Sequence, residues 1–232
     1  MRSDSTLRLH QSVAQDLGIA ILSGVYQPGA HFAGEIEQSA AMGVSRTAYR
    51  EAIRILTAKG LLESKPKAGT HVTPRERWNL LDPDMLAWMF MGTPDEQFIR
   101  DLFELRNLLE PAAAKLAADR RTSQQLEVMQ AAITDMRAHG LATPEGQAAD
   151  QRFHATLLAA SGNQALATLA SSVGAAVQWT TNFKQRANAN PRDPLPEHVA
   201  VFDAIASSDA TLAFGAMETL IDLALKDMAV AL

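Results

Sequence analysis

The stretch from Gly43 to Ala52 constrains the fold of this chain more than any other ten residues. Gly43 ends one helical segment, and Ser45 is placed to cap the next helix by accepting a hydrogen bond from a first-turn backbone N–H. Arg46 and Arg50 follow four residues apart, so both side chains project from one face. Such a helix can enter a DNA major groove, with its first turns facing base edges and phosphates. Taken singly, each arginine is better explained as part of a solvated helix face.

The flanking segments predict that this helix belongs to a helix-turn-helix. Apolar residues at helical spacing predict a first helix over residues 5–24, and a turn at 26–29 separates it from a short helix over 35–42. The capped helix is predicted to run to Lys59, with Gly60 as its C-cap. Two helices joined by a glycine turn are typical of this motif.

Residues 61–73 predict a β-hairpin next to the capped helix. A short strand over 61–64 leads into a basic turn over 65–69 and a second strand over 70–73. Lys65 and Lys67 at the tip are placed to reach phosphates or the minor groove. A helix-turn-helix followed by such a hairpin is a winged helix.

The order and spacing of these residues resemble the winged-helix domain of GntR-type bacterial transcription regulators. The match covers nearly all of residues 7–74 and consists of Gly24, Pro28, Gly29, Glu35, Gly43 to Thr47, Arg50 to Ala52, Leu56, Gly60, Leu61, Gly69, Thr70 and Val72. The chain departs from the pattern at Ile36, where some members carry a DNA-contacting arginine. The DNA-binding residues implied are Arg46 and Arg50 for bases and phosphates, Ser45 and Thr47 for phosphates, and Lys67 and Gly69 on the wing beside Lys65.

Charge and composition are consistent with two unlike parts. Residues 1–77 contain 10 Lys/Arg and 7 Asp/Glu, a net charge of +3, whereas the remainder carries −8. A basic front on an acidic body suits a nucleic-acid-binding module joined to a second domain. The chain has no cysteine, which excludes disulfides and cysteine-ligated zinc. Its apolar runs are too short to span a bilayer and no signal peptide is visible, so we expect a soluble cytoplasmic protein without a membrane partner.

Beyond residue 74 the sequence predicts helices only. Residues 75–94 read as a linker with a short helix beginning at Asp82-Pro83. Six further helices are predicted, over residues 95–119, 122–139, 145–161, 163–187, 195–207 and 209–231. Long helices with short connections predict an antiparallel bundle. The expected fold is mainly α, with a winged helix-turn-helix over 1–74, the linker over 75–94, and an all-helical effector-binding and dimerisation domain over 95–232.

The helical region resembles the all-helical FCD effector domain found in the FadR branch of the same family, over roughly residues 95–230. The matching motifs are Leu105-Arg106 with Glu110-Pro111, Asp150 with Phe153-His154, Ser161-Gly162-Asn163, and Glu197-His198. Within that branch, the connector over 78–88 and the segment over 105–111 are most similar to members that respond to sugar acids.

Three of these residues form a candidate metal site. Asp150 and His154 lie four residues apart on one helix face, and His198 begins a later helix. One carboxylate and two imidazoles suit zinc or a similar divalent ion. The resemblance implies that they are metal ligands, but Leu220 stands at the family's fourth ligand position. Two alternatives stay open: a three-ligand metal site of reduced affinity, and a metal-free site whose histidines hydrogen-bond an acid directly.

Arg106 is the remaining candidate for effector binding. It lies on an otherwise apolar helix face, where an unpaired charge is costly. Its guanidinium either grips the carboxylate of an effector or forms an internal salt bridge, with Glu110 or Asp150 as partner. Residues 179–182 on the predicted 163–187 helix carry hydroxyl and amide groups that suit a polyhydroxy acid, although ordinary packing accounts for them equally well.

These features together predict a ligand-responsive transcription regulator, more specifically a repressor of sugar-acid catabolism, and no enzyme. A homodimer would place two winged helices on a double-stranded DNA operator, and an aldonate-like organic acid bound in the bundle would change operator affinity. One rival is a metal-dependent hydrolase in which the Asp/His/His set activates water; no further acidic residue is spaced as an obvious general base. The other is an architectural DNA-binding dimer that ignores effectors.

Overall fold

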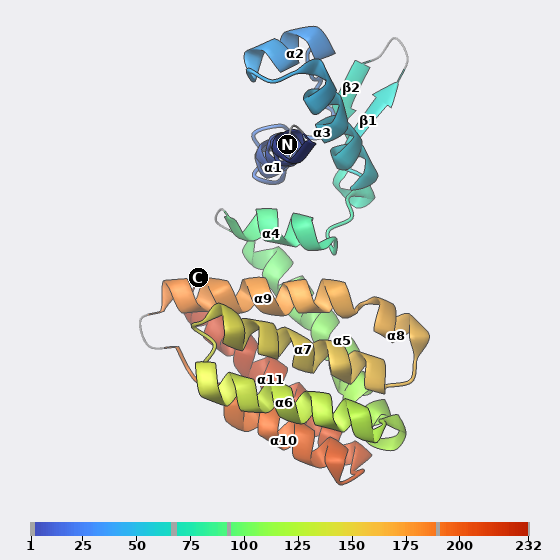
Figure 1. The fold of residues 1–232 in the computed structure, drawn as a ribbon, viewed down its shortest axis with the longest axis vertical. Coiled ribbons are helices and arrows are strands. Elements are labelled where there is room, and N and C mark those ends of the chain that lie inside the picture. Colours follow the sequence, from blue (N-terminus) through green and yellow to red (C-terminus); the bar gives the residue numbers. More distant parts are fainter. Residues whose placement is uncertain (1–2, 66–68, 92–93, 189–190, 232) are drawn as a thin grey trace. The chain divides into compact units, whose positions relative to one another are not determined.

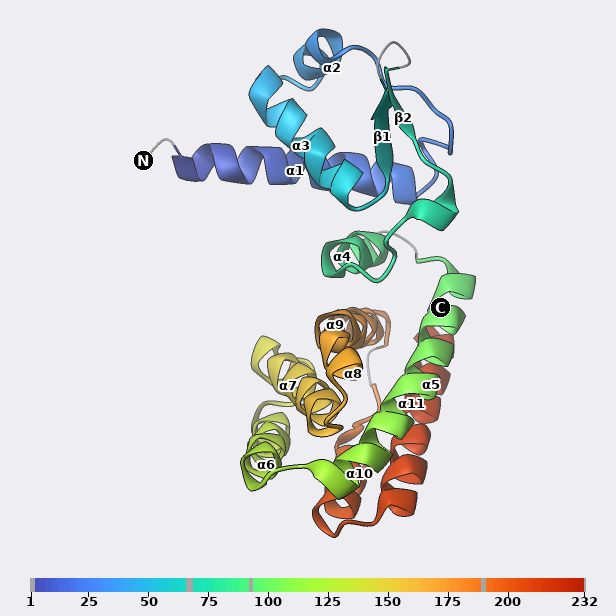
Figure 2. The ribbon, with the colours of Figure 1, turned by 90° about the vertical axis from the view of Figure 1, so that its right-hand side faces the viewer.

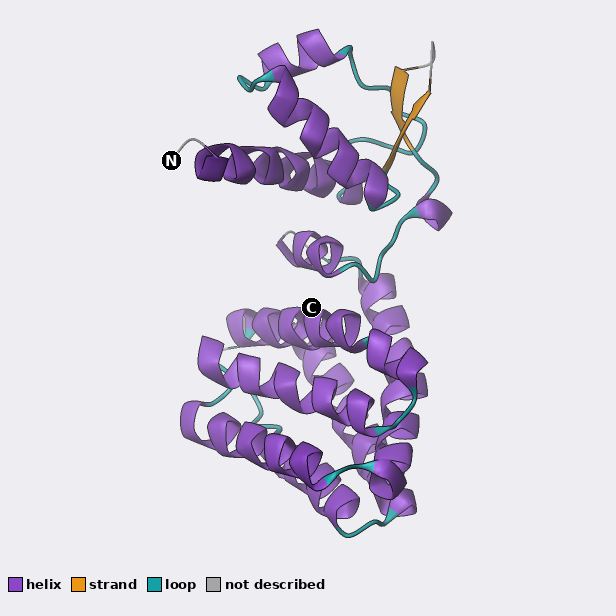
Figure 3. Ribbon diagram, turned by 45° about the vertical axis from the view of Figure 1, so that its right-hand side comes forward, coloured by secondary structure: helices purple, strands orange, loops and turns teal. Residues whose placement is uncertain are grey.

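Helices dominate the chain, and they form two compact units. The computed structural model describes residues 3–65, 69–91, 94–188 and 191–231. The units are Met1–Thr93 and Pro94–Leu232. Within the described residues, the two-stranded hairpin of the first unit is the only sheet (Figure 3). The expected mainly helical fold with a two-stranded wing is confirmed.

The first unit is the winged helix that the sequence predicts (Figure 1). The strands pair antiparallel, with Leu62 opposite Val72 and Lys65 opposite Gly69. The elements, in chain order, are α1 Ser3–Leu22, α2 Glu35–Ala41, α3 Arg46–Ala58, β1 Leu62–Lys65, β2 Gly69–Val72, the 3-10 turn η1 Arg75–Arg77, and α4 Pro83–Met91.

One apolar core joins these elements. Leu17 and Ile21 of α1 pack with Leu56 of α3 and Val72 of β2, and all four are less than 5% exposed. Gly60 allows the chain to turn from α3 into the hairpin. Its φ is +79°, and a Cβ there would lie 2.1 Å from the backbone oxygen of Arg77. Only glycine fits both the left-handed backbone and the close approach.

Helix α4 packs into this first unit. The ring of Trp88 lies over Gly18 of α1, so closely that a Cβ on Gly18 would come within 2.4 Å of it. The ammonium of Lys59, which ends α3, contacts Asp82 at 2.6 Å and Asp84 at 2.8 Å. The helix expected within the 75–94 linker is therefore anchored by both apolar and ionic contacts. The role of that segment as a linker stays a prediction.

The second unit is an all-helical bundle (Figure 2). Helix α5 packs along α11, and α7 packs against α5, α6 and α9. The helices are α5 Glu96–Arg120, α6 Ser123–His139, α7 Pro144–Ala160, α8 Gln164–Thr168, α9 Ala170–Ala187, α10 Leu195–Ala206 and α11 Ala210–Ala231.

The predicted single helix over 163–187 is wrong in one respect, because the structure divides it into α8 and α9 at Leu169. Asn163 caps α8 by accepting from the backbone N–H groups of Ala165 and Leu166. No proline or glycine marks the break, so helical periodicity runs through it unchanged. None of the helices described is both long enough and apolar enough to cross a membrane.

Candidate functional site

The exposed face of α3 carries the predicted DNA-binding residues. The side-chain oxygen of Ser45 accepts a hydrogen bond from the Ala48 backbone N–H at 3.1 Å, so the predicted N-cap is present. The apolar face of α3, which includes Ala52 and Leu56, is buried. Arg46 and Thr47 are exposed at the first turn. The buried face thus fixes the helix, and its cationic face is left free for solvent or a ligand.

Arg50 is held by an acidic residue of the neighbouring helix. Its Nη2 and Nε donate to the two carboxylate oxygens of Glu35 at 2.8 and 3.1 Å, which joins α3 to α2. The hydrogen bonds from Arg50 lower the pKa of the Glu35 carboxyl. The arginine side chain nevertheless remains 58% exposed. The sequence analysis did not anticipate this pair, because Glu35 and Arg50 belong to different helices.

The wing presents basic residues around one carboxylate. Lys65 lies 3.4 Å from Glu63, which also accepts from Arg77 at 2.7 Å. Gly69 begins β2 with a φ of +74°, in the left-handed region that favours glycine. Lys67 lies outside the described residues.

The structure brings the predicted metal ligands together in the second unit. Asp150 and His154 come from α7 and His198 from α10, and each is at most 3% exposed. Oδ1 of Asp150 lies 3.0 Å from Nε2 of His198 and 3.4 Å from Nε2 of His154. One ligand atom from each residue lies within 4.8 Å of the other two. Such a set can surround a single divalent ion.

The second ring nitrogen of each histidine, Nδ1, contacts an acceptor that is not part of the Asp/His/His set. Nδ1 of His198 donates to the carbonyl of Pro194 at 2.8 Å, and Nδ1 of His154 contacts the carboxylate of Glu110. Metal-ligating histidines ordinarily donate their second N–H to such an acceptor, which fixes the ring with Nε2 facing the metal. The donor set therefore fits a divalent ion. Leu220 is buried on α11 and adds no donor atom, as expected from the sequence.

Arg106 forms the internal salt bridge that the sequence analysis considered. Its Nε donates to Glu110 at 2.6 Å, with side chains only 5% and 0% exposed. Burial alone raises the pKa of Glu110, but the charges of Arg106 and His154 lower it to about 2. Within the described residues, Nη1 and Nη2 of Arg106 have no acceptor. The salt bridge thus leaves both terminal nitrogens of Arg106 available to a ligand.

Glu110 is an acidic neighbour of the histidines that the sequence named only as a possible partner of Arg106. Glu110 of α5 contacts His154 of α7. The four-residue spacing from Arg106 does place Glu110 on the same helix face. The packing of α5 on α7 brings it to the histidine, and no local sequence pattern specifies that packing.

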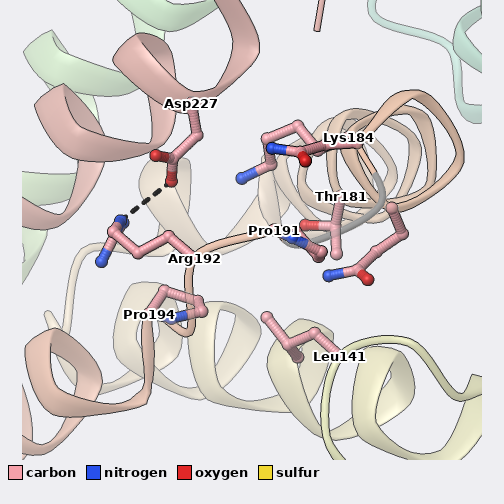
Figure 4. A pocket seen from close by; sticks show the side chains of 9 residues that line it. Leu141, Thr181, Lys184, Pro191, Arg192, Pro194 and Asp227 are labelled. Carbon is pink, nitrogen blue, oxygen red and sulfur yellow. Dashed lines mark hydrogen bonds and ion pairs between the residues drawn. The ribbon is translucent and has the colours of Figure 1, made fainter. Parts of the chain in front are cut away.

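The second unit also contains a small cavity (Figure 4). Its volume is about 20 Å³. Pro194 lines the cavity, and its carbonyl accepts from Nδ1 of His198. Sequence reasoning missed most of its polar residues, since they come from α9, α11 and the segment before α10. The lining residues are Leu141, Thr181, Lys184, Gln185, Asn188, Pro191, Arg192, Pro194 and Asp227.

Residues 179–182 have different surroundings. Thr181 lines the cavity. Thr180 is buried, and its hydroxyl donates to the carbonyl of Ala176 one turn earlier at 2.7 Å. Of the two hydroxyls, that of Thr181 is therefore the one placed to contact a ligand.

Both units match family models. The model for bacterial regulatory proteins of the gntR family matches residues 9–72, and the FCD domain model matches residues 101–223. The chain belongs to the GntR family and carries an FCD domain. It is a transcription regulator and not an enzyme.

The chain is similar to individual transcription regulators over most of its length. The chain is 36% identical to the galactonate operon transcriptional repressor of Escherichia coli K12 over 219 residues, or 93% of this chain and 95% of the relative. It is 30% identical to the regulator LutR of Bacillus subtilis 168, over 85% of this chain and 90% of the relative. A solved structure of Lar, described as controlling the expression of the Listeria monocytogenes agr system, shares the fold. The TM-score is 0.64 at 18% identity, covering 95% of this chain and 96% of Lar.

Proposed function

We propose that this protein is a homodimeric repressor whose operator affinity is changed by an aldonate-like acid bound in the helical unit. The observation that carries the proposal is the set of Asp150, His154 and His198, three buried polar side chains turned toward one point inside the bundle. A structural bundle has no need of such a set, because buried charge is costly unless it is paired or ligated. The 36% identity to a galactonate operon repressor supports the class of effector.

On the DNA side, α3 would lie in the major groove. Arg46 and Arg50 would contact bases and phosphates, while Ser45 and Thr47 would donate to phosphate oxygens. Lys65, Lys67 and Gly69 would form the wing contact. Two copies of the chain would place two such helices on the half-sites of a pseudo-palindromic operator.

On the effector side, Asp150, His154 and His198 would hold a divalent ion, with zinc as the first candidate. A bound ion would supply a Lewis-acidic centre for oxygen atoms of the acid. Arg106 would donate hydrogen bonds from its terminal nitrogens to the carboxylate of the acid. In the metal-free alternative, the two histidines and Arg106 would bind the acid directly.

Coupling requires that the acid favour one arrangement of the DNA-binding units over another. Because α4 packs against α1, we expect it to move with the winged helix as one body. Binding of the acid would then move α4 and the winged helix together.

Fluorescence anisotropy with a labelled operator tests the proposal. A six-carbon aldonate should weaken operator binding by wild-type protein, and Asp150→Asn should abolish the response while leaving binding without acid unchanged. Zinc should raise the melting temperature by mass action, and a chelator should reverse the rise. If no acid changes operator affinity, the protein is the effector-insensitive architectural dimer instead.

A metal-dependent hydrolase, the alternative function, would need a general base close to the histidines. Glu110 lies beside His154, but its salt bridge to Arg106 and its pKa of about 2 make it a poor proton acceptor at neutral pH. Turnover by purified, zinc-loaded protein would support that alternative.

A further inference from the structure

Lys184 of α9 is a half-buried cation that lines the cavity. Its side chain extends toward the Arg192–Asp227 pair across the cavity (Figure 4). Within the described residues, no acceptor lies within hydrogen-bonding or ion-pair distance of its ammonium. Burial lowers the pKa of Lys184, and the more distant charge of Asp227 only partly offsets this. An ammonium in such a place requires a ligand or water as its acceptor.

Arg192 also lines the cavity, and it pairs with Asp227 of the lining and with Glu197 behind it. Arg192 donates from Nε to Asp227 at 3.0 Å, and its Nη1 lies 2.8 Å from Glu197. Among the described residues, Nη2 of Arg192 and Oε2 of Glu197 are buried without a partner. At the cavity itself, Lys184 and Nη2 of Arg192 are donors, while the carboxylate of Asp227 and the hydroxyl of Thr181 can accept. A hydroxyl group both donates and accepts, so it is the uncharged group that suits this lining.

Charge and volume decide what kind of group this cavity takes. The cations Lys184 and Arg192 face the anions Asp227 and Glu197, so no positive charge is left over for a second carboxylate. The volume of about 20 Å³ is room for one water-sized group. The cavity is therefore suited to a hydroxyl and not to a carboxylate.

We infer that this cavity is the subsite for the hydroxylated end of the effector, and that Lys184 is a specificity-determining residue within it. The inference rests on the proposed function, in which Arg106 and the Asp/His/His set bind the carboxylate end. The two places lie close together, because the charges of Arg106 and Asp150 act on the pKa of Lys184 and because Pro194, which lines the cavity, accepts from Nδ1 of His198. The ligand class is a monocarboxylic acid with hydroxyl groups along its chain, in preference to short hydroxy acids and to diacids.

Isothermal titration calorimetry on the full chain, without DNA, tests this with three probes. Glycerate shares the carboxylate end and lacks the tail, galactonate has both, and galactarate replaces the terminal hydroxyl by a second carboxylate. Wild-type protein should bind galactonate at least about tenfold more tightly than either of the others, since a hydrogen bond to a charged group contributes roughly that factor or more.

Lys184→Met is the informative variant, and Lys226→Met, at an exposed position on α11, is its matched control. Lys184→Met should lose about tenfold in galactonate affinity and leave glycerate affinity unchanged, whereas Lys226→Met should behave as wild type. Lys184→Met should also melt no lower than wild type, because it removes a half-buried ammonium that has no acceptor among the described residues. A structural ion pair with Asp227 would predict the opposite change in melting temperature.

The outcomes separate the two claims. If Lys184→Met weakens glycerate and galactonate by the same factor, or weakens neither, the subsite is wrong and the effector proposal stands. Tighter binding of galactarate than of galactonate by wild type also overturns the subsite, since the cavity would then take an anion. If wild-type protein binds none of the three acids, the proposed function fails and the subsite fails with it.

Discussion

An Arg–Glu pair joins predicted site residues in each unit of this protein, Arg50–Glu35 in the first and Arg106–Glu110 in the second, and these two pairs differ in burial. Arg50 and Glu35 on the winged helix have side chains 58% and 34% exposed. Arg106 and Glu110 in the bundle are 5% and 0% exposed. The exposed pair is surrounded by water, so its arginine can exchange a carboxylate for a phosphate at little cost. The buried pair cannot exchange in that way, because each charge needs the other to remain in the protein interior.

The two pairs should therefore differ most in how much they contribute to the free energy of unfolding. Glu110→Ala leaves the Arg106 charge and the Nδ1 of His154 without their acceptor, and we expect it to lower the free energy of unfolding by about 3–5 kcal/mol. Glu35→Ala, its exposed counterpart, should leave the unfolding free energy nearly unchanged. Urea unfolding followed by circular dichroism measures both. Equal losses would show that burial does not distinguish the two pairs.

A second comparison concerns α4 and its place in the first unit. Trp88→Ala removes the ring that packs on Gly18, and we expect it to destabilise the first unit by about 3–5 kcal/mol. Hydrogen exchange should then accelerate in α1 and α3 and stay slow in α5 to α11. Trp179→Ala, on α9, is the control that should act on the second unit instead. Faster exchange across the bundle of Trp88→Ala would contradict this division.

Removing the exposed arginine should affect DNA binding and not stability. Arg50→Ala should weaken operator binding on the order of 10- to 100-fold, as expected for loss of a good base contact, while the melting temperature stays at the wild-type value. Arg100→Ala removes an exposed arginine that pairs with Glu96 on α5, and it should leave operator affinity unchanged. An equal effect of the two substitutions would show that only overall charge matters.

The smallest expected effect comes from the partner of Arg50. Glu35→Gln removes a negative charge that competes with DNA phosphate for the guanidinium, so operator affinity should rise slightly, most clearly at low salt. Titrations at two salt concentrations would show this. A marked loss of affinity would mean that Glu35 instead orients Arg50 for its contact.

The winged helix was predicted well because its signals are local. Ser45 accepts the predicted capping bond, and Gly43 and Gly60 have the positive φ values expected at helix ends. The three metal-ligand candidates were found from the resemblance and from spacing within α7. The structure adds that their outer nitrogens are held by Pro194 and Glu110.

What the sequence did not reveal depends on contacts between distant elements. Glu110 reaches His154 only through the packing of α5 on α7, and Lys184, Arg192 and Asp227 meet from three separate segments. The break at Leu169 has no helix-breaking residue, so no sequence signal marks it. Burial shifts the pKa values of these groups, and how deeply each group is buried depends on how the helices pack in the bundle.

Operator binding with and without a sugar acid tests the central claim most directly. The claim is that an acid held by the buried charges of the bundle changes the affinity of the exposed arginines for DNA. Anisotropy titrations of a labelled operator with wild-type protein should shift to weaker binding when galactonate is added. Asp150→Asn should bind the same operator equally well with and without the acid. An acid response that persists in Asp150→Asn, or that is absent from wild type, would contradict the account.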